Sequence, residues 1–198
     1  MADIILQGEA NIPTKYGEFR MRAYSCSETD YVPTIVLLND RTKLDKPVHV
    51  RIHSECITGD LFGSMKCECG EQLDLSMKII SEEGGLVIYL RQEGRGIGII
   101  NKLHAYRQQE KGLDTIEANK ILGLEIDSRR YDTAINILKQ LNIHSIILLT
   151  NNPEKLSALR EAGFISVERK SLIITPKKEN KGYLKTKKDK MGHDVEVE

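Results

Sequence analysis

Residues 85–98 read GLVIYLRQEGRGIG, from Gly85 to Gly98, and this stretch decides the fold. Its first part, residues 85–90, is a short apolar run of the kind that forms a buried strand. Three glycines at alternate positions follow, and residues 97–111 have the pattern of a helix. A buried strand, a glycine-rich turn and a helix in succession indicate α/β organisation in this part of the chain.

The segments on either side continue this alternation. Before the stretch, Leu73, Met77 and Ile80 recur at helical spacing, and Gly84-Gly85 ends that helix. After it, helices are expected at residues 115–122 and 132–141, and buried or final strands at 145–150 and 167–174. Between those two strands, Asn152 is expected to cap a helix that has Pro153 at its first position and Gly163 just past its end.

The first forty-five residues have the pattern of β structure. Strands are expected at residues 4–6, 18–23, 34–38 and 47–53. The predicted fold class is therefore α+β, a single domain over residues 1–174 with an N-terminal β-rich part and a mixed sheet flanked by helices. Residues 175–198 are rich in lysine and have few large apolar side chains, so we expect a flexible tail.

Composition excludes several classes of protein. The 198 residues are 40% hydrophobic and 29% charged, which suits a globular protein with a core. There are 29 basic and 29 acidic residues, so no global charge favours nucleic acid or an acidic membrane. No apolar run is long enough to span a membrane, and the first residues lack the features of a signal peptide. We expect a cytoplasmic protein whose phosphorylated ligands bind to a local cluster.

Three cysteines, Cys56, Cys67 and Cys69, form C-x10-C-x-C and are followed at once by Gly70. Cytosolic thiols stay reduced, so clustered cysteines there indicate a metal or catalysis. Ligands one residue apart face the same ion only where the chain turns, and Gly70 permits a turn. Three protein ligands that leave a position for water are typical of a catalytic zinc site.

Two alternatives to this catalytic site remain open. A fourth ligand would make the zinc site structural, and Cys26, His53 and Glu55 are the candidates. Cys26 lies in a probable strand. The other alternative is three buried free cysteines without a metal, which are common in protein cores.

Residues 91–98 (RQEGRGIG) are a candidate phosphate-binding turn. Its glycines let backbone N–H groups approach an anion, and Arg91 and Arg95 add forked donors. The segment matches neither the P-loop nor the dinucleotide-binding pattern, so a purely structural turn is an alternative. Lys155, in the first turn of the capped helix, opposes the helix dipole, and a bound anion would reverse that penalty.

Long motifs in fixed order resemble GTP cyclohydrolase II. They are RIHSECITGD (51–60), KCECG (66–70), RQEGR (91–95), DTIEAN (114–119), LTNNP (149–153) and KMGH (190–193). The similarity runs from about residue 9 to residue 193. Nothing in the sequence resembles the dihydroxybutanone phosphate synthase domain fused to some members, so we expect the stand-alone form.

The resemblance implies a reaction and a set of site residues. GTP would be hydrolysed at C8 of its imidazole ring to 2,5-diamino-6-ribosylamino-4(3H)-pyrimidinone 5′-phosphate, formate and pyrophosphate, in the first committed step of riboflavin biosynthesis. One zinc ion per subunit would be held by the three cysteines plus water, and magnesium would accompany the triphosphate. The family acts as homodimers. The residues that would bind GTP are Arg51, Ile52, His53, Ser54, Glu55, Gln72, Glu93, Gly94, Arg95, Thr115, Thr150 and Lys155.

The resemblance also assigns three catalytic residues. Asp127 would accept a proton, and Arg129 would be the nucleophile that takes the nucleotidyl group. Because a guanidinium stays protonated, Arg129 alternatively stabilises charge on the departing pyrophosphate, or the two residues are a surface pair. Tyr106 would be needed for the full reaction, since related enzymes without this tyrosine stop at the formylated pyrimidine.

One departure and two rival functions follow from the same residues. Many family members carry asparagine where Gly96 stands, and we expect glycine to loosen the turn without loss of function. The first rival function is an enzyme that opens GTP but releases the formylated pyrimidine. The second is a catalytically silent, zinc-stabilised nucleotide-binding module.

Overall fold

The computed structural model describes residues 4–26 and 32–192 and divides into two compact units. Unit 1 comprises Met1–His53, Asp74–Arg91 and Tyr131–Leu172, and unit 2 comprises Ser54–Leu73, Gln92–Arg130 and Ile173–Glu198. We describe each unit by itself. Among the described residues, no helix has the length and apolar character that crossing a membrane requires.

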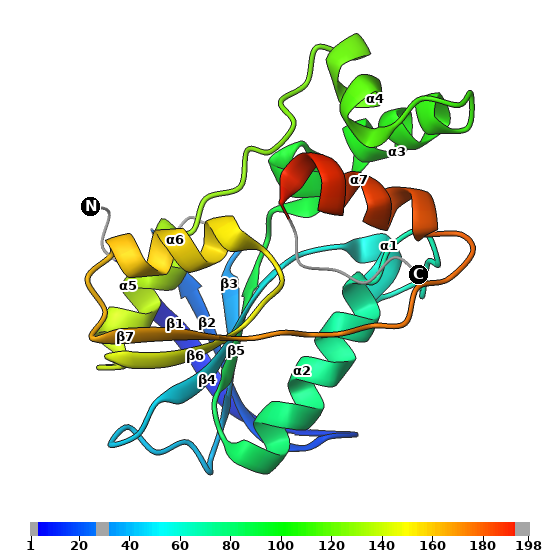
Figure 1. Cartoon of the computed structure of the whole chain (residues 1–198). Helices are drawn as coiled ribbons and strands as arrows, with labels where there is room; N and C mark the ends of the chain where they lie inside the picture. Colours follow the sequence, from blue (N-terminus) through cyan, green and yellow to red (C-terminus); the bar gives the residue numbers. More distant parts are fainter. Residues whose placement is uncertain (1–3, 27–31, 193–198) are drawn as a thin grey trace. The chain divides into compact units, whose positions relative to one another are not determined.

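Unit 1 is built on a mixed seven-stranded sheet with the order β1-β2-β3-β5-β4-β6-β7 (Figure 1). The strands β1, β2, β3 and β5 pair antiparallel in succession, whereas β4, β6 and β7 pair parallel. The strands are β1 (Ile5–Thr14), β2 (Gly17–Ser25), β3 (Thr34–Asn39), β4 (Val48–Ser54), β5 (Leu86–Leu90), β6 (Ser145–Leu149) and β7 (Ser166–Lys170). The predicted fold class, a β-rich N-terminal part and a mixed sheet flanked by helices, is confirmed.

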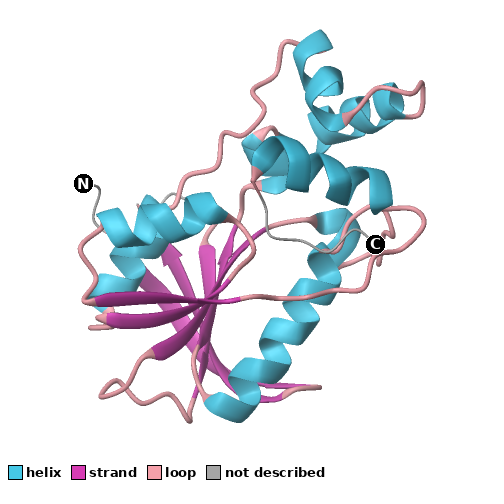
Figure 2. Cartoon of the chain, viewed as in Figure 1, coloured by secondary structure: helices cyan, strands magenta, loops and turns pink. Residues whose placement is uncertain are grey.

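The core of unit 1 is a contiguous apolar cluster with side chains from strands and helices. Figure 2 shows these strands in magenta and the helices in cyan. Helices α5 (Asp132–Gln140) and α6 (Pro153–Glu161) contribute Ile137, Leu138 and Leu159, all fully buried. Full burial of such a side chain is worth about 1.5–3 kcal/mol. Asn152 caps α6 by accepting from the Glu154 N–H at 2.9 Å, as its position before Pro153 predicts.

Strand β1 is much longer than the predicted strand at residues 4–6. It is the edge strand of the sheet, and most of its residues are exposed. Exposed residues of an edge strand need not alternate between apolar and polar side chains. The sequence therefore predicted only residues 4–6 of this strand. Cys26, predicted to lie in a strand, instead follows the last residue of β2 and is exposed.

Unit 2 is mainly helical. It contains α1 (Ile57–Asp60), the 3₁₀ turn η1 (Glu93–Gly96), α3 (Gly98–Gln109), α4 (Thr115–Ile121) and α7 (Lys181–Met191). Helix α2 (Cys69–Glu83) begins in unit 2 and continues into unit 1. Helix α4 starts at a capping box, in which Asp114 accepts from two backbone N–H groups and Glu117 accepts from the Asp114 N–H.

The stretch predicted as a flexible tail contains helix α7. Leu184 on this helix is only 2% exposed, and the Lys177 ammonium lies 2.8 Å from a Glu71 carboxylate oxygen. These two anchors explain why a lysine-rich segment folds here, since apolar burial and an ion pair both oppose fraying. The domain boundary at residue 174 stays a prediction, and His193 of the KMGH motif lies outside the described residues.

Candidate functional site

The three predicted zinc ligands converge in unit 2. The sulfur atoms of Cys56, Cys67 and Cys69 all lie within 4.8 Å of one another, and the Cys56 and Cys67 sulfurs are 3.6 Å apart. Cys56 is the residue before α1, and Cys69 is the first residue of α2. Gly70 makes this approach feasible, because a Cβ at that position would lie 2.4 Å from the Gly59 carbonyl oxygen.

The electrostatics of the three thiols fit a cation. Hydrogen bonds with the neighbouring thiols lower the pKa of Cys56, and the hydrogen bond with Cys56 raises the pKa of Cys67 to about 11. The pKa of Cys69 is raised well above its usual value, first by its hydrogen bond with Cys56. The hydrogen bonds among the thiols therefore favour the ionised form of Cys56 over those of Cys67 and Cys69, and a divalent ion would stabilise all three thiolates. Three soft sulfur donors suit zinc.

The cluster bears on whether a fourth residue could bind the metal ion. Among the described residues, the group of potential ligand atoms that meets at this point consists of the three cysteines, without Glu55. In unit 1, the His53 ring stacks on Tyr89 at 5.4 Å between centroids, and Cys26 is exposed. The arrangement could hold a metal ion with three protein ligands.

A buried ion pair lies against the cysteine cluster. The Lys102 ammonium is 2.7 Å from a Glu93 carboxylate oxygen and 3.2 Å from the Cys56 sulfur. The other Glu93 oxygen accepts from the Ile57 N–H at 2.5 Å. Glu93 thereby links the predicted phosphate-binding turn to the start of α1, directly after Cys56.

The turn at residues 93–96 adopts a backbone that favours glycine. Gly94 and Arg95 both have left-handed conformations, with φ of 62° and 61°. Such a conformation is uncommon for arginine and is held here by neighbours: the Arg95 carbonyl accepts from the Ser128 N–H at 3.0 Å. At Gly96, φ is +92° and an added Cβ would lie 3.2 Å from the Ser128 backbone. A larger residue at position 96 would therefore require Ser128 to move.

Asp127 and Arg129 form a bidentate pair in unit 2. Arg129 Nε donates to both Asp127 carboxylate oxygens at 2.8 and 3.1 Å, and Nη2 donates to one of them. Their side chains are 14% and 10% exposed respectively, which excludes the surface-pair alternative. Burial alone would raise the pKa of Asp127, but the hydrogen bonds and charge of Arg129 outweigh it and lower that pKa.

Tyr106, on α3, lies beside two lysines. The Lys66 and Lys102 ammonium groups are 4.9 and 5.7 Å from the centroid of its ring. Burial raises the pKa of the Tyr106 hydroxyl, so it is a neutral hydrogen-bond donor at neutral pH. Through Lys102 the ring belongs to the same cluster as Cys56.

The other predicted GTP-binding residues of unit 2 lie in the first turns of helices, at the last residue of β4 and directly after it. The Ser54 hydroxyl accepts from the Gln92 side chain at 2.8 Å, and Gln72 is buried, 3.4 Å from a Glu68 oxygen. Thr115 is the first residue of α4, and Glu55 is partly buried.

The remaining predicted GTP-binding residues gather in unit 1 at the carboxyl ends of β4 and β6. These strands are parallel neighbours, and Arg51 Nη1 donates to the Leu149 carbonyl oxygen at 3.0 Å. Ligands commonly bind at such strand ends. Thr150 follows β6 and is 1% exposed.

Lys155, in the first turn of α6, is not on the surface but 4% exposed. Its ammonium donates to the Ile52 carbonyl oxygen at 2.8 Å. The Ile52 side chain belongs to the apolar core, so this residue offers only its backbone to a ligand.

The sequence did not predict two residues of unit 2 that contact predicted site residues. Lys102 is buried at 9% exposure, and its signal was its spacing of three from Ala105, which shares the buried face of α3. Tyr183 on α7 lies 3.3 Å from Arg95 Nη2 through its hydroxyl. It had no signal, because its stretch had too few apolar residues to predict a packed helix.

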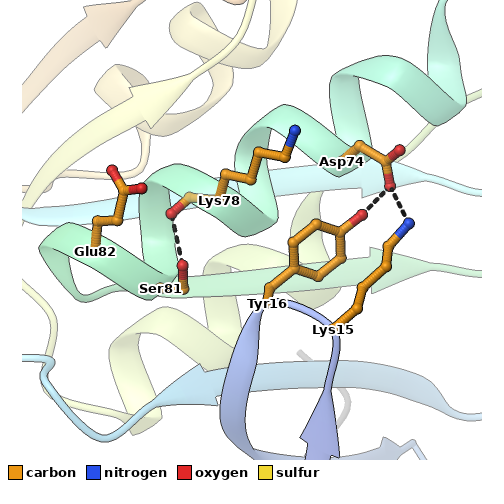
Figure 3. Close-up of a pocket in the computed structure, with 6 residues that line it drawn as sticks. All are labelled: Lys15, Tyr16, Asp74, Lys78, Ser81 and Glu82. Atoms are coloured by element: carbon orange, nitrogen blue, oxygen red, sulfur yellow. Dashed lines mark hydrogen bonds and ion pairs between the residues drawn. The ribbon is translucent and has the colours of Figure 1, made fainter.

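A pocket of unit 1 is unrelated to any predicted site residue. Six residues from the β1–β2 hairpin and α2 line it: Lys15, Tyr16, Asp74, Lys78, Ser81 and Glu82 (Figure 3). Tyr16 and Lys15 both contact the Asp74 carboxylate, the lysine at 3.5 Å. The contacts fasten the hairpin to the helix.

Comparisons with known proteins identify the family of this chain. The family model for GTP cyclohydrolase II matches residues 6–171. GTP cyclohydrolase-2 of Haemophilus influenzae is 46% identical over 196 residues, which cover 98% of this chain and 91% of that protein. GTP cyclohydrolase-2 of Picrophilus torridus is 48% identical over 186 residues, covering 93% of this chain and 96% of that protein.

A third relative is longer than this chain. Riboflavin biosynthesis protein RibBA of Chlorobium phaeovibrioides is 50% identical over 188 residues, which cover 94% of this chain but 46% of that protein. The chain thus spans about half the length of this relative and nearly all of the two GTP cyclohydrolase-2 proteins. The match of the family model over most of the chain, and the extent of these similarities, show that the chain belongs to the GTP cyclohydrolase II family of riboflavin biosynthesis enzymes.

Proposed function

We propose that the chain opens the imidazole ring of GTP at C8 and releases formate and pyrophosphate with 2,5-diamino-6-ribosylamino-4(3H)-pyrimidinone 5′-phosphate. The observation that carries this proposal is the convergence of the three cysteine sulfurs to within 4.8 Å in a member of this family. C8 of a purine is a weak electrophile, so its hydration needs a strong nucleophile at neutral pH. A metal centre is the ordinary source of one.

Cys56, Cys67 and Cys69 would hold zinc in this proposal. When bound, zinc would act as a Lewis acid that lowers the pKa of water for attack on the ring. Tyr106 lies in the same cluster through Lys102, and its neutral hydroxyl would donate a hydrogen bond to the formamide that forms first. We assign it the second hydrolysis, which releases formate.

Each unit has charged residues that are candidates for binding the triphosphate and its magnesium. In unit 1, the Arg51 guanidinium and the Lys155 ammonium lie at the ends of neighbouring parallel strands. In unit 2, Arg95 and the backbone N–H groups of the η1 turn supply forked and main-chain donors. A buried lysine or arginine that donates to carbonyl oxygens is already positioned, so little side-chain entropy would be lost on binding.

Asp127 and Arg129 would carry out the release of pyrophosphate. An Arg129 nitrogen must lose a proton if it is to attack phosphorus, and Asp127 accepts hydrogen bonds from two of its nitrogens. The lowered pKa of Asp127 keeps this carboxylate ionised, so it would orient the guanidinium. The proton would pass to Asp127 only as the bond from the Arg129 nitrogen to phosphorus forms, pyrophosphate leaves and that nitrogen becomes more acidic. Cytoplasmic location and a homodimeric state complete the proposal.

The test is mass spectrometry of the products after zinc-loaded protein has been incubated with GTP and magnesium. Formate, pyrophosphate and the diaminopyrimidinone support the proposal. A formylated pyrimidine would leave ring opening intact but contradict the role of Tyr106. Unchanged GTP, from protein whose zinc content has been verified, would overturn the proposal in favour of a silent binding module.

A further inference from the structure

Lys102 on α3 is a buried lysine whose donors are all used. The residue is 9% exposed, and its ammonium group has three N–H donors. They are within reach of the Cys56 sulfur at 3.2 Å, the Thr58 hydroxyl at 3.0 Å and the Glu93 carboxylate at 2.7 Å. A lysine in this setting is held in one geometry by three partners, so its contact with the sulfur is fixed.

Glu93 explains how the charge of Lys102 is held in place. One carboxylate oxygen of Glu93 accepts from Lys102 and from the Gly94 N–H at 2.7 Å, and the other accepts from the Ile57 N–H. The carboxylate is therefore satisfied by backbone donors as well as by the lysine. An ion pair alone would not require the third ammonium donor to face Cys56.

Three thiolates leave an excess negative charge around a divalent ion. In a buried site that charge is costly unless a cation lies nearby. Thiolates also donate more electron density to zinc than imidazoles do, which weakens its action as a Lewis acid. A hydrogen bond from an ammonium group to one sulfur withdraws density from that sulfur and reduces both effects.

We propose that Lys102 is a positioning residue of the metal centre, which donates to Cys56, offsets the excess charge of the three thiolates and limits the electron donation of Cys56 to the metal. This inference rests on the proposed zinc-dependent function. The competing account is that Lys102 and Glu93 form a buried ion pair that only stabilises the fold.

Cobalt in place of zinc tests the inference, because thiolate-to-cobalt charge transfer absorbs in the near ultraviolet and its energy reports the electron density on sulfur. In Lys102→Gln the charge is lost, so we expect the band to move to longer wavelength with cobalt still bound. Lys102→Arg keeps the charge and should restore the band most of the way. Lys66→Gln is the matched control, since the Lys66 ammonium also faces Tyr106 but pairs with Glu110 at 3.3 Å.

A double variant, Lys102→Met with Glu93→Gln, separates the two accounts and leaves no uncompensated buried carboxylate if the single variant fails to fold. The inference predicts a band at longer wavelength in the double variant as well. A wild-type spectrum in either Lys102→Gln or the double variant would overturn the inference alone. A wild-type protein that shows no thiolate-to-cobalt band would contradict the metal centre, and with it the proposed function.

Discussion

The interiors of the two units are built from different materials. Unit 1 buries a contiguous apolar cluster, in which Val50, Ile137 and Leu148 have no exposed surface. Its buried cations, Arg51 and Lys155, donate to backbone carbonyl oxygens. Unit 2 buries sulfur and charge: Cys56 and Cys67 are 5% and 6% exposed, and Glu93 and Lys102 are 8% and 9% exposed. Apolar burial stabilises a fold regardless of partner, whereas a buried charge stabilises it only when the right partner is present.

This difference distinguishes unit 1, which holds the large apolar cluster, from unit 2, which holds the cysteine cluster and a buried ion pair. Unit 1 can keep its structure through changes in a metal ion or a ligand. Unit 2 depends on exact pairing, and the cysteine cluster would depend on its ion. Substitutions in the two units should therefore have opposite effects on stability and on metal content.

The largest effect is expected from Cys67→Ser. Removal of one of three ligands should remove zinc and slow ring opening by about 10³-fold or more, since Lewis-acid catalysis is worth several kcal/mol. Formate release would measure ring opening, and elemental analysis would measure the zinc content. Pyrophosphate release should persist. Cys26→Ser is the control, because Cys26 is an exposed free cysteine. Undiminished formate from Cys67→Ser would remove the basis for a metal centre in unit 2.

Arg129→Ala should come next. Loss of the guanidinium that Asp127 orients is expected to lower turnover of GTP by about 10²–10³-fold, the usual cost of a missing charge-stabilising group, and more if Arg129 is the nucleophile. Pyrophosphate release measures it directly. Arg130→Ala is the matched control. The contact of Arg130 with Gln92 is made by the backbone N–H, so this substitution leaves it in place. A near-normal rate in Arg129→Ala would leave that residue without a catalytic role.

Ile137→Ala, in unit 1, is expected to lower stability without lowering zinc content. The side chain is fully buried in the apolar cluster, and its truncation should lower the free energy of unfolding by about 2–5 kcal/mol. Zinc content at 20 °C or below should stay at the wild-type level while the protein remains folded. Urea unfolding gives the first quantity and elemental analysis the second. Loss of zinc in proportion to the loss of stability would show that the two interiors are not independent.

The smallest effect concerns pH and the buried pair in unit 2. Because Arg129 lowers the pKa of Asp127 below its unfolded value of about 3.9, the carboxylate contributes stability that is fully present above that value. The contribution is lost as the pH falls through the lower, folded pKa. Between about pH 5 and pH 3, the free energy of unfolding of wild type should therefore fall more than that of Asp127→Asn. Parallel curves for the two proteins would mean that the pair adds nothing to stability.

The sequence predicted unit 1 better than unit 2, for a physical reason. Residues 86–90 and 146–149 form short, mainly apolar runs because most of their side chains are buried, and these runs mark β5 and β6 closely. The edge strand β1 lacks that pressure, so its length was underestimated. Local signals such as the Asn152 cap with Pro153 were sufficient because capping depends on adjacent residues.

In unit 2 the sequence predicted the cysteine cluster but not the residues around it. The spacing of Cys56, Cys67 and Cys69 predicted their convergence, since ligand sets leave a regular mark along the chain. A lysine in a helix usually lies on the surface. The spacing of Lys102 from Ala105 could have indicated that it is buried, but not that it lies beside the Cys56 sulfur and the Glu93 carboxylate. The sequence gives no sign that Lys155 is buried, and in the structure its ammonium donates to the Ile52 carbonyl oxygen from a buried position.

The most direct test of the account is a zinc titration of metal-stripped protein, followed by formate release from GTP with magnesium present. The account predicts a rate that rises in proportion to added zinc and levels off at one ion per chain, while Cys67→Ser stays inactive throughout. Formate release that is already complete before zinc is added, and that zinc does not change, would contradict the claim that the cysteine cluster of unit 2 is the centre of the chemistry.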